Sequence, residues 1–169
     1  TEVKDRIGDF PVTVTAGTAN LVPTTGSSNG ADNEIIVLGG DIDTQLLWPE
    51  NSIPFTMTTC SVSRYTGGPR KRILNGYSSP TPSVNWLHGH WKDRRGVAHY
   101  VNWVTGNGGE SASIGVKDHW LIMCGNSNSV IIIDQMNMPT MYRAGHHALS
   151  RLNINYSPSD LSDFEVHSV

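Results

Sequence analysis

The sequence has little charge and almost no helical signal. Charged residues make up only 16% of the 169 residues, and neutral Ser, Thr, Asn and Gly carry much of the polarity. No window of a dozen residues holds apolar positions at helical spacing without a Gly or Pro inside it. The formal net charge of −3 leaves no basic excess to neutralise a phosphate backbone, so we do not expect a nucleic acid as partner.

Long apolar runs and catalytic motifs are also missing. The longest apolar run, residues 130–133, has the length of a strand, whereas a membrane-spanning helix needs about 20 apolar residues. We therefore expect no membrane insertion. The sequence contains no nucleophile elbow, phosphate-binding loop or dinucleotide-binding fingerprint. Its nearest approach to the paired acids of a glycosidase, Asp41-Ile42-Asp43, is followed by neutral residues, and we expect no enzyme.

What the sequence does contain is a series of short β-rich runs between turn clusters. This pattern is typical of a sandwich or barrel, and it shows no internal repeat and no linker. We expect one domain over residues 1–169, and because the last run reaches the final residue, we expect the chain to be a fragment of a longer polypeptide. The expected strands lie at residues 10–15, 35–38, 55–65, 72–74, 86–91, 97–104, 120–124, 130–134, 149–154 and 164–169.

The run at residues 86–91 alternates cleanly, and residues 97–104 are its expected partner strand. Side chains of an alternating strand fall on two faces: Trp86, His88 and His90 on one, and Leu87, Gly89 and Trp91 on the other. With His99 on the neighbouring strand, a zinc site of three histidines is geometrically conceivable. The competing interpretation, which we favour, is that these histidines are hydrogen-bonded groove or core residues.

Aromatic residues in this region give the clearest binding signal. Sugars bind proteins through ring faces stacked on Trp or Tyr and through neutral hydrogen bonds, and both kinds of group are present here. The predicted glycan site comprises Trp86, His88, His90, Trp91, Arg94, Tyr100, Asn102 and Trp103. The alternative is that the aromatics belong to the core of the sandwich. We expect at least two of Trp86, Trp91, Tyr100 and Trp103 to be buried.

Two features concern maturation. Cys60 and Cys124 form no CxxC motif and no zinc-finger spacing with histidine, so they are either one disulfide or two buried thiols. Asn155 opens the only N-x-S/T sequon, which makes it a candidate glycosylation site. The proline that follows the sequon makes this modification less favourable.

Several segments resemble laminin-G-like domains, which are concanavalin A-like and pentraxin-like. Phe55-Thr56-Met57 resembles the "FT-x-apolar" strand that opens many of these domains, and Trp120-Leu121-Ile122 resembles their central "W-apolar" strand. Residues 72–76 resemble a following strand and turn, and residues 152–155 with 162–166 resemble the closing pair of strands. Residues 85–91 and 95–100 are similar to a subgroup found in large extracellular proteins of algae and protists. The resemblance implies a two-sheet antiparallel jelly-roll sandwich.

The resemblance also bears on the cysteines and on metal binding. In pentraxins a Cys on the "FT" strand is bridged to one on a later strand, and Cys60 and Cys124 occupy matching positions. A disulfide here would imply maturation in an oxidising compartment. Loops of laminin-G-like domains often bind calcium, and no other cofactor is expected. The candidate calcium ligands are Asp32, Glu34, Asp41 and Asp43, although such residues are also common in turns that hold no ion.

Together these observations predict a non-catalytic module for binding or adhesion, extracellular or at the cell surface, that recognises a glycan or a protein. The alternative is a structural subunit buried in a filament or a larger assembly. In this alternative the last strand, residues 164–169, is an unpaired edge that recruits a neighbouring chain.

Overall fold

The computed structural model shows two antiparallel β-sheets packed on each other, which confirms the predicted all-β sandwich. The structure describes residues 3–4, 11–24, 30–77, 85–105, 115–128, 130–134, 136–138, 150–156 and 160–168. Every regular element within these residues is a strand. None of the described segments forms a helix long and apolar enough to cross a membrane.

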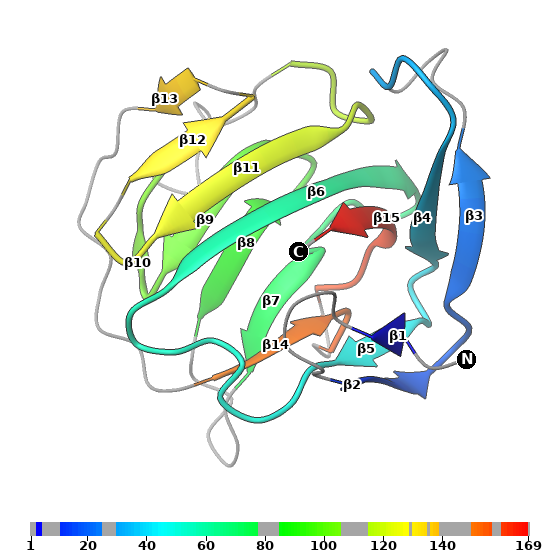
Figure 1. Ribbon diagram of the computed structural model, residues 1–169, viewed down its shortest axis with the longest axis horizontal. Helices are drawn as coiled ribbons and strands as arrows, with labels where there is room; N and C mark the ends of the chain where they lie inside the picture. The colour runs from blue at the N-terminus through cyan, green and yellow to red at the C-terminus, as the bar shows by residue number, and fades with distance from the viewer. Residues whose placement is uncertain are drawn as a thin grey trace.

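The two sheets form the two layers of the sandwich. Figure 1 looks onto the seven-stranded sheet, with β7, β8 and β9 of the other sheet behind it. The seven-stranded sheet runs in the order β13 (Met136–Met138), β12 (Ile131–Ile133), β11 (Leu121–Asn126), β6 (Thr58–Gly67), β15 (Asp163–Ser168), β4 (Ile35–Gly40) and β3 (Asn20–Thr24). The eight-stranded sheet runs in the order β1 (Val3–Lys4), β2 (Pro11–Ala16), β5 (Gln45–Leu47), β14 (Arg151–Ile154), β7 (Leu74–Tyr77), β8 (Trp86–His90), β9 (Arg95–Tyr100) and β10 (Asn102–Trp103).

The last strand lies in the interior of its sheet. β15 pairs with β6 on one side and with β4 on the other, and Figure 1 shows it between them. Phe164 and Val166 of β15 point into the core, with exposed fractions of 0% and 6%. The expectation that the final strand is an unpaired edge was therefore wrong, because a strand with two neighbours has no free ladder to offer another chain.

The core between the sheets follows the alternation of the strands. On β6, Ser61, Ser63 and Tyr65 are buried, while Cys60 is exposed and Val62 is only half-buried. The hydrophobic core takes side chains from both sheets, among them Trp86 and Tyr100 from one and Leu121, Met123 and Phe164 from the other. The side-chain period of two thus runs through β6, and the structure places its odd-numbered residues 61, 63 and 65 on the inner face.

Glycines account for the main differences between expected and observed strands. Asn75-Gly76 was expected to end a strand as a turn but lies inside β7. A Cβ atom on Gly76 would lie 2.7 Å from the Cβ atom of Trp86, so this glycine allows two backbones and a large indole to pack closely. Gly39-Gly40 likewise lies within β4 instead of stopping it. Strands β1, β3, β5 and β13 were not predicted, and the expected strand at residues 97–104 is divided into β9 and β10 by a turn at Val101.

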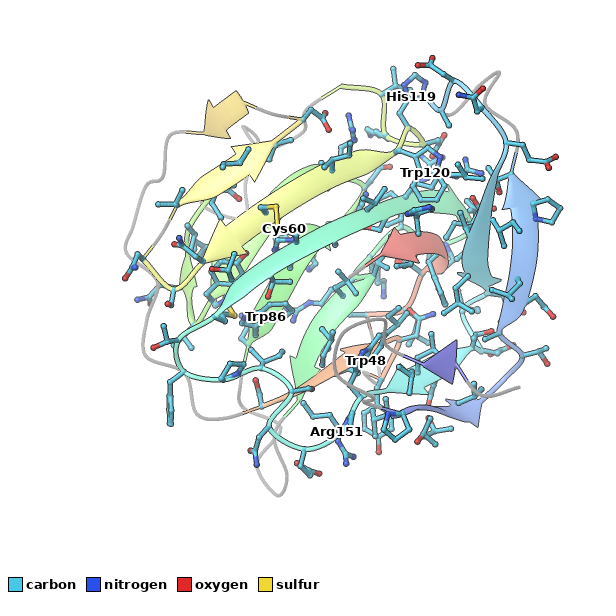
Figure 2. All side chains as sticks on the ribbon, in the orientation of Figure 1. Trp48, Cys60, Trp86, His119, Trp120 and Arg151 are labelled. Atoms are coloured by element: carbon cyan, nitrogen blue, oxygen red, sulfur yellow. A yellow bond between two sulfur atoms is a disulfide. The ribbon has the colours of Figure 1, made fainter. Side chains whose placement is uncertain are left out.

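Cys60 and Cys124 form a disulfide, which excludes the alternative of two buried thiols. They face each other directly on β6 and β11, with their Cα atoms 4.0 Å apart. Figure 2 shows the bond between these two strands. Cys60 is exposed and Cys124 is half-buried, so the bond lies on the outer face of the seven-stranded sheet and not in the core.

Candidate functional site: two tryptophans in contact

The structure divides the predicted glycan site into a buried half and a surface half. The buried half has an exposed fraction of 0% at each residue and consists of Trp86, His88, His90 and Tyr100. These four side chains lie between the sheets, so the prediction that they contact a glycan was wrong. The physical reason is that the inner face of β8 and β9 packs on the other sheet. We expected at least two of Trp86, Trp91, Tyr100 and Trp103 to be buried, and the burial of Trp86 and Tyr100 confirms this.

The two buried histidines are neutral core residues. Burial lowers the pKa of His88 to about 4 and that of His90 to about 3, because the apolar interior disfavours the charged imidazolium. One ring nitrogen of His88 lies 2.6 Å from the hydroxyl of Tyr100, and the other lies 3.2 Å from the backbone oxygen of Met123. His90 Nδ1 lies 3.4 Å from Ser63 Oγ. The histidines thus link the two sheets.

The three-histidine zinc site is not assembled. His99 pairs with Leu87 in the ladder and shares the face opposite to His88 and His90. Within the described part of the chain, no group of three or more His, Cys, Asp or Glu side chains could hold a metal ion. The favoured interpretation of these histidines, as hydrogen-bonded core residues, agrees with where the structure places them.

The surface half of the predicted site begins at the turn between β8 and β9. Trp91 and Arg94 exchange backbone hydrogen bonds of 3.2 Å and 3.1 Å across the turn. Lys92 and Asp93 between them have φ angles of 48° and 62°. Left-handed values at both central residues are those of a type I′ turn, whose twist matches the twist of the strands it joins. This geometry fixes where the Trp91 side chain leaves the sheet.

A second reversal lies at the other end of β9. Tyr100 and Asn102 are partners in the β9–β10 ladder, so Val101 alone makes the turn. Its φ angle of 66° is uncommon for a β-branched residue. The reversal places Trp103 opposite His99 and leaves Asn102 exposed. Strained backbone of this kind occurs where surrounding contacts hold it, and it is enriched at binding and catalytic sites.

Trp91, at the turn after β8, and Trp103, on β10, are in contact. Their ring centroids are 5.0 Å apart with an interplanar angle of 43°, and both side chains are half-buried. Lys92 Nζ lies 4.3 Å from the Trp91 ring centroid and Arg94 Cζ lies 6.0 Å from it, within the range of cation–π contacts. We call Trp91, Arg94 and Trp103 the tryptophan patch. The fourth surface residue of the predicted site, Asn102, is the ladder partner of the core-facing Tyr100, so it lies on the opposite face of the sheet from Trp103.

The buried His99 packs against Trp103 of the patch. The rings of His99 and Trp103 meet edge to face, with centroids 4.6 Å apart. His99 Nδ1 lies 2.5 Å from the backbone oxygen of Asn85, and its Nε2 lies 3.4 Å from the Asn85 side-chain nitrogen. Burial is the main cause that lowers the pKa of His99. A neutral ring that donates from Nδ1 and accepts at Nε2 satisfies both contacts.

Charged residues anchor the turn that carries Trp91. Asp93 bonds to Lys117 and, at 3.0 Å, to Arg70 Nη1. Arg70 also reaches Asp118 at 2.7 Å. The hydrogen bond from Lys117 is the first cause that lowers the pKa of Asp93, so Asp93 stays ionised at neutral pH. The backbone nitrogen of Asp93 donates to the Arg70 oxygen at 2.6 Å, which ties the turn to the loop after β6.

The predicted calcium ligands do not come together. Asp32 and Glu34 precede β4, whereas Asp41 and Asp43 follow it. The six residues of this strand span about 20 Å, so one ion cannot bind both pairs. Asp41 Oδ1 accepts hydrogen bonds from the Asp43 backbone nitrogen at 3.1 Å and from Thr44 Oγ1 at 2.9 Å. These contacts are those of a turn-forming aspartate.

Asn155 is buried, which contradicts its prediction as a glycosylation site. Its exposed fraction is 1%. The side-chain nitrogen donates to the backbone oxygens of Asp41 and Ser162 at 3.0 Å and 2.8 Å, and its oxygen accepts from the Ser162 nitrogen at 2.9 Å. An attached sugar would replace a donor in this network and would have no space. Asn155 instead joins the end of β14 to the turns before β5 and β15.

Comparison with known proteins gives no relative for this arrangement. No protein-family model, no curated protein and no solved structure matches the chain. The laminin-G-like resemblance therefore remains a prediction, and the function has to be argued from the residues themselves.

Proposed function

We propose that the chain is a non-catalytic binding module that holds a glycan against the tryptophan patch. The observation that carries the proposal is the half-exposed pair of Trp91 and Trp103, with ring centroids 5.0 Å apart. Two partly exposed tryptophan rings in contact form an apolar platform with polar edges.

The polar neighbours of the platform suit a neutral, hydroxyl-rich ligand. The Lys92 ammonium and the Arg94 guanidinium lie at the Trp91 ring and can donate hydrogen bonds to hydroxyl or carbonyl oxygens. Both side chains belong to the same turn as Trp91. A sugar ring placed on the platform would thus meet an apolar surface below and hydrogen-bonding groups at its rim.

The disulfide supports an extracellular or cell-surface location for this module. Disulfides persist in oxidising compartments and are rare in the reducing cytosol. The bond between Cys60 and Cys124 lies on an exposed sheet face, where reductants would reach it. An extracellular setting is therefore part of the proposal, and a glycan of a cell surface or matrix is the ligand class that such a setting offers.

Binding to oligosaccharides tests the proposal. Linear hexasaccharides of glucose, xylose, mannose and N-acetylglucosamine are titrated into the protein by isothermal calorimetry. We expect at least one of them to bind, and we expect Trp91→Ala and Trp103→Ala to weaken that binding by roughly ten-fold or more, since burying the apolar surface of a large side chain is worth about 1.5–3 kcal/mol. Phe55→Ala is the control, because Phe55 is an exposed aromatic outside the patch.

Three outcomes would contradict the proposal. If none of the hexasaccharides binds, the ligand is not one of these glycans, and a protein ligand becomes the better hypothesis. If binding survives in both tryptophan variants, the patch is not the site. If Phe55→Ala weakens binding as much as Trp103→Ala does, the loss reflects the general removal of aromatic surface.

A separate observation favours the structural-subunit alternative. The outer face of the seven-stranded sheet exposes apolar side chains: Ile122 with 49% of its surface, Val130 with 47% and Ile132 with 37%. The disulfide lies among them, because Cys124 is the ladder partner of both Cys60 and Ile132. Exposed apolar patches of this kind often mark protein interfaces.

In its simplest form this alternative predicts association between copies of the chain. Sedimentation velocity over a wide concentration range would then detect dimers or larger species, and Ile122→Lys would return the protein to monomers. A protein that stays monomeric at all concentrations would contradict association through this face.

A further inference from the structure

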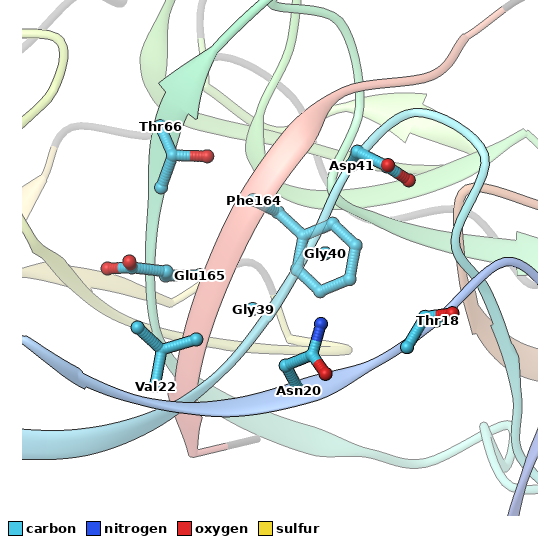
Figure 3. A pocket seen from close by; sticks show the side chains of 9 residues that line it. All are labelled: Thr18, Asn20, Val22, Gly39, Gly40, Asp41, Thr66, Phe164 and Glu165. Carbon is cyan, nitrogen blue, oxygen red and sulfur yellow. The ribbon is translucent and has the colours of Figure 1, made fainter.

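A shallow depression lies on the other sheet, away from the tryptophan patch. Its volume is ≈ 340 Å³, and its lining comes from β3, β4, β6 and β15 and the ends of these strands. Figure 3 shows Val22 and Asn20 on one side, Thr66 and Asp41 on the opposite side, and Gly39 and Glu165 between them. The depression is open to solvent, since Asn20, Thr66 and Asp41 are exposed.

Gly39, which has no side chain, forms part of the floor of the depression. Gly39 pairs with Asn20 on one side and with Glu165 on the other, so a side chain here would stand between those two. A Cβ atom on Gly39 would lie 3.3 Å from Val22 Cγ2 and 3.6 Å from Glu165 Cγ. The first of these contacts is tighter than ordinary van der Waals packing, so an alanine here would displace Val22 slightly and raise the floor of the depression.

Most polar groups in the lining are carboxylate and hydroxyl oxygens that can accept hydrogen bonds. The carboxylates of Asp41 and Glu165 line it together with the hydroxyls of Thr18 and Thr66, and no Lys or Arg lines it. Glu165 Oε2 bonds to Arg64 Nε at 2.7 Å, which holds this mostly buried carboxylate in place. Hydroxyl groups that donate to carboxylates form short, charge-assisted hydrogen bonds.

We propose that this depression is a second saccharide site, which takes one neutral sugar unit through hydroxyl groups donated to Asp41 and Glu165. The pocket has the volume expected for small-ligand sites. The Glu165 charge is paired with Arg64, but the Asp41 carboxylate has no Lys or Arg beside it in the lining and would repel acidic sugars, so the site selects neutral units over uronic acids. This inference rests on the proposed function only for the class of ligand, a saccharide. It places a second contact on the opposite sheet, which would allow one domain to bind two glycan chains.

Amide NMR titration with simple glycosides tests the inference. The probes are the methyl glycosides of glucose, galactose and mannose, with methyl glucuronide as the acidic comparison. We expect a neutral glycoside to shift the backbone amide signals of Asn20, Gly39 and Thr66, and we expect the glucuronide to leave them in place. Gly39→Ala and Thr66→Val should each weaken the neutral glycoside by roughly five-fold, because a lost hydrogen bond or a filled floor costs about 1 kcal/mol.

Thr58→Val is the matched control, since Thr58 is also an exposed threonine on β6 but lies at the other end of the strand. It should bind as the wild type does. Unshifted amides at Asn20, Gly39 and Thr66 with every neutral glycoside would overturn the inference, as would wild-type affinity in both Gly39→Ala and Thr66→Val. Shifts confined to the indole signals of Trp91 and Trp103 would overturn it while leaving the proposed function intact. Shifts confined to the depression would support it and count against the tryptophan patch.

Discussion

Acidification should destabilise this domain through its two buried histidines. Both are fully buried, with folded pKa values of about 4 for His88 and about 3 for His90, against 6.5 for the unfolded chain. Above pH 6.5 both states are neutral at these sites and the full stability is present. As the pH falls below 6.5, the histidines bind protons in the unfolded state but stay neutral in the folded state. The free energy of unfolding therefore decreases progressively until the pH reaches the folded pKa values.

The magnitude follows from the size of the shifts. A pH of 5 lies about 1.5 units below the pKa of histidine in the unfolded chain. Protonation of each histidine therefore stabilises the unfolded state, and lowers the free energy of unfolding, by about 2 kcal/mol. Urea unfolding followed by tryptophan fluorescence at pH 7.5 and pH 5 measures the loss. In His90→Phe, which keeps a ring beside Tyr65, we expect the loss between the two pH values to be about 2 kcal/mol smaller. An equal loss in wild type and variant would refute the reasoning.

Three further predictions concern stability and maturation. Cys60→Ala/Cys124→Ala should lower the free energy of unfolding by about 4 kcal/mol in the chain-entropy model, since the bond spans 64 residues; an unchanged urea midpoint would contradict this. Gly40→Ala should destabilise by about 1–3 kcal/mol through overpacking, because its Cβ atom would lie 2.7 Å from Thr44 Cγ2, and a melting temperature equal to that of the wild type would argue against it. Expression in a secretory host should give an intact mass without an N-linked glycan at Asn155, and a glycosylated folded product would count against the buried network.

The sequence was informative wherever strand alternation decided the structure. Trp86, His88 and His90 share one face as their spacing predicts, and Cys60 and Cys124 face each other as the family resemblance implied. Alternation alone does not say which face is covered by the second sheet. The alternation that grouped Trp86 with a candidate sugar site is equally consistent with the place of Trp86 in the core, where the structure has it.

Other features depend on contacts between distant segments, and local sequence could not show them. Asn155 is part of an ordinary sequon, yet its amide bonds to Asp41, which is 114 residues away. Gly39 was interpreted as a strand terminator, because glycine is a common breaker. Its actual role, the floor of a depression between β3 and β15, appears only when the neighbouring strands are in place. A glycine pair after a short apolar run was the one signal that could have raised this possibility.

The central claim is that Trp91 and Trp103 contact a glycan, and the indole N–H signals in an NMR titration test it most directly. The chain has five tryptophans, and Trp86, fully buried between the sheets, serves as an internal control. With the hexasaccharide that binds in calorimetry, we expect the Trp91 and Trp103 indole signals to shift while that of Trp86 stays in place. Unmoved Trp91 and Trp103 signals at saturating hexasaccharide would contradict the account.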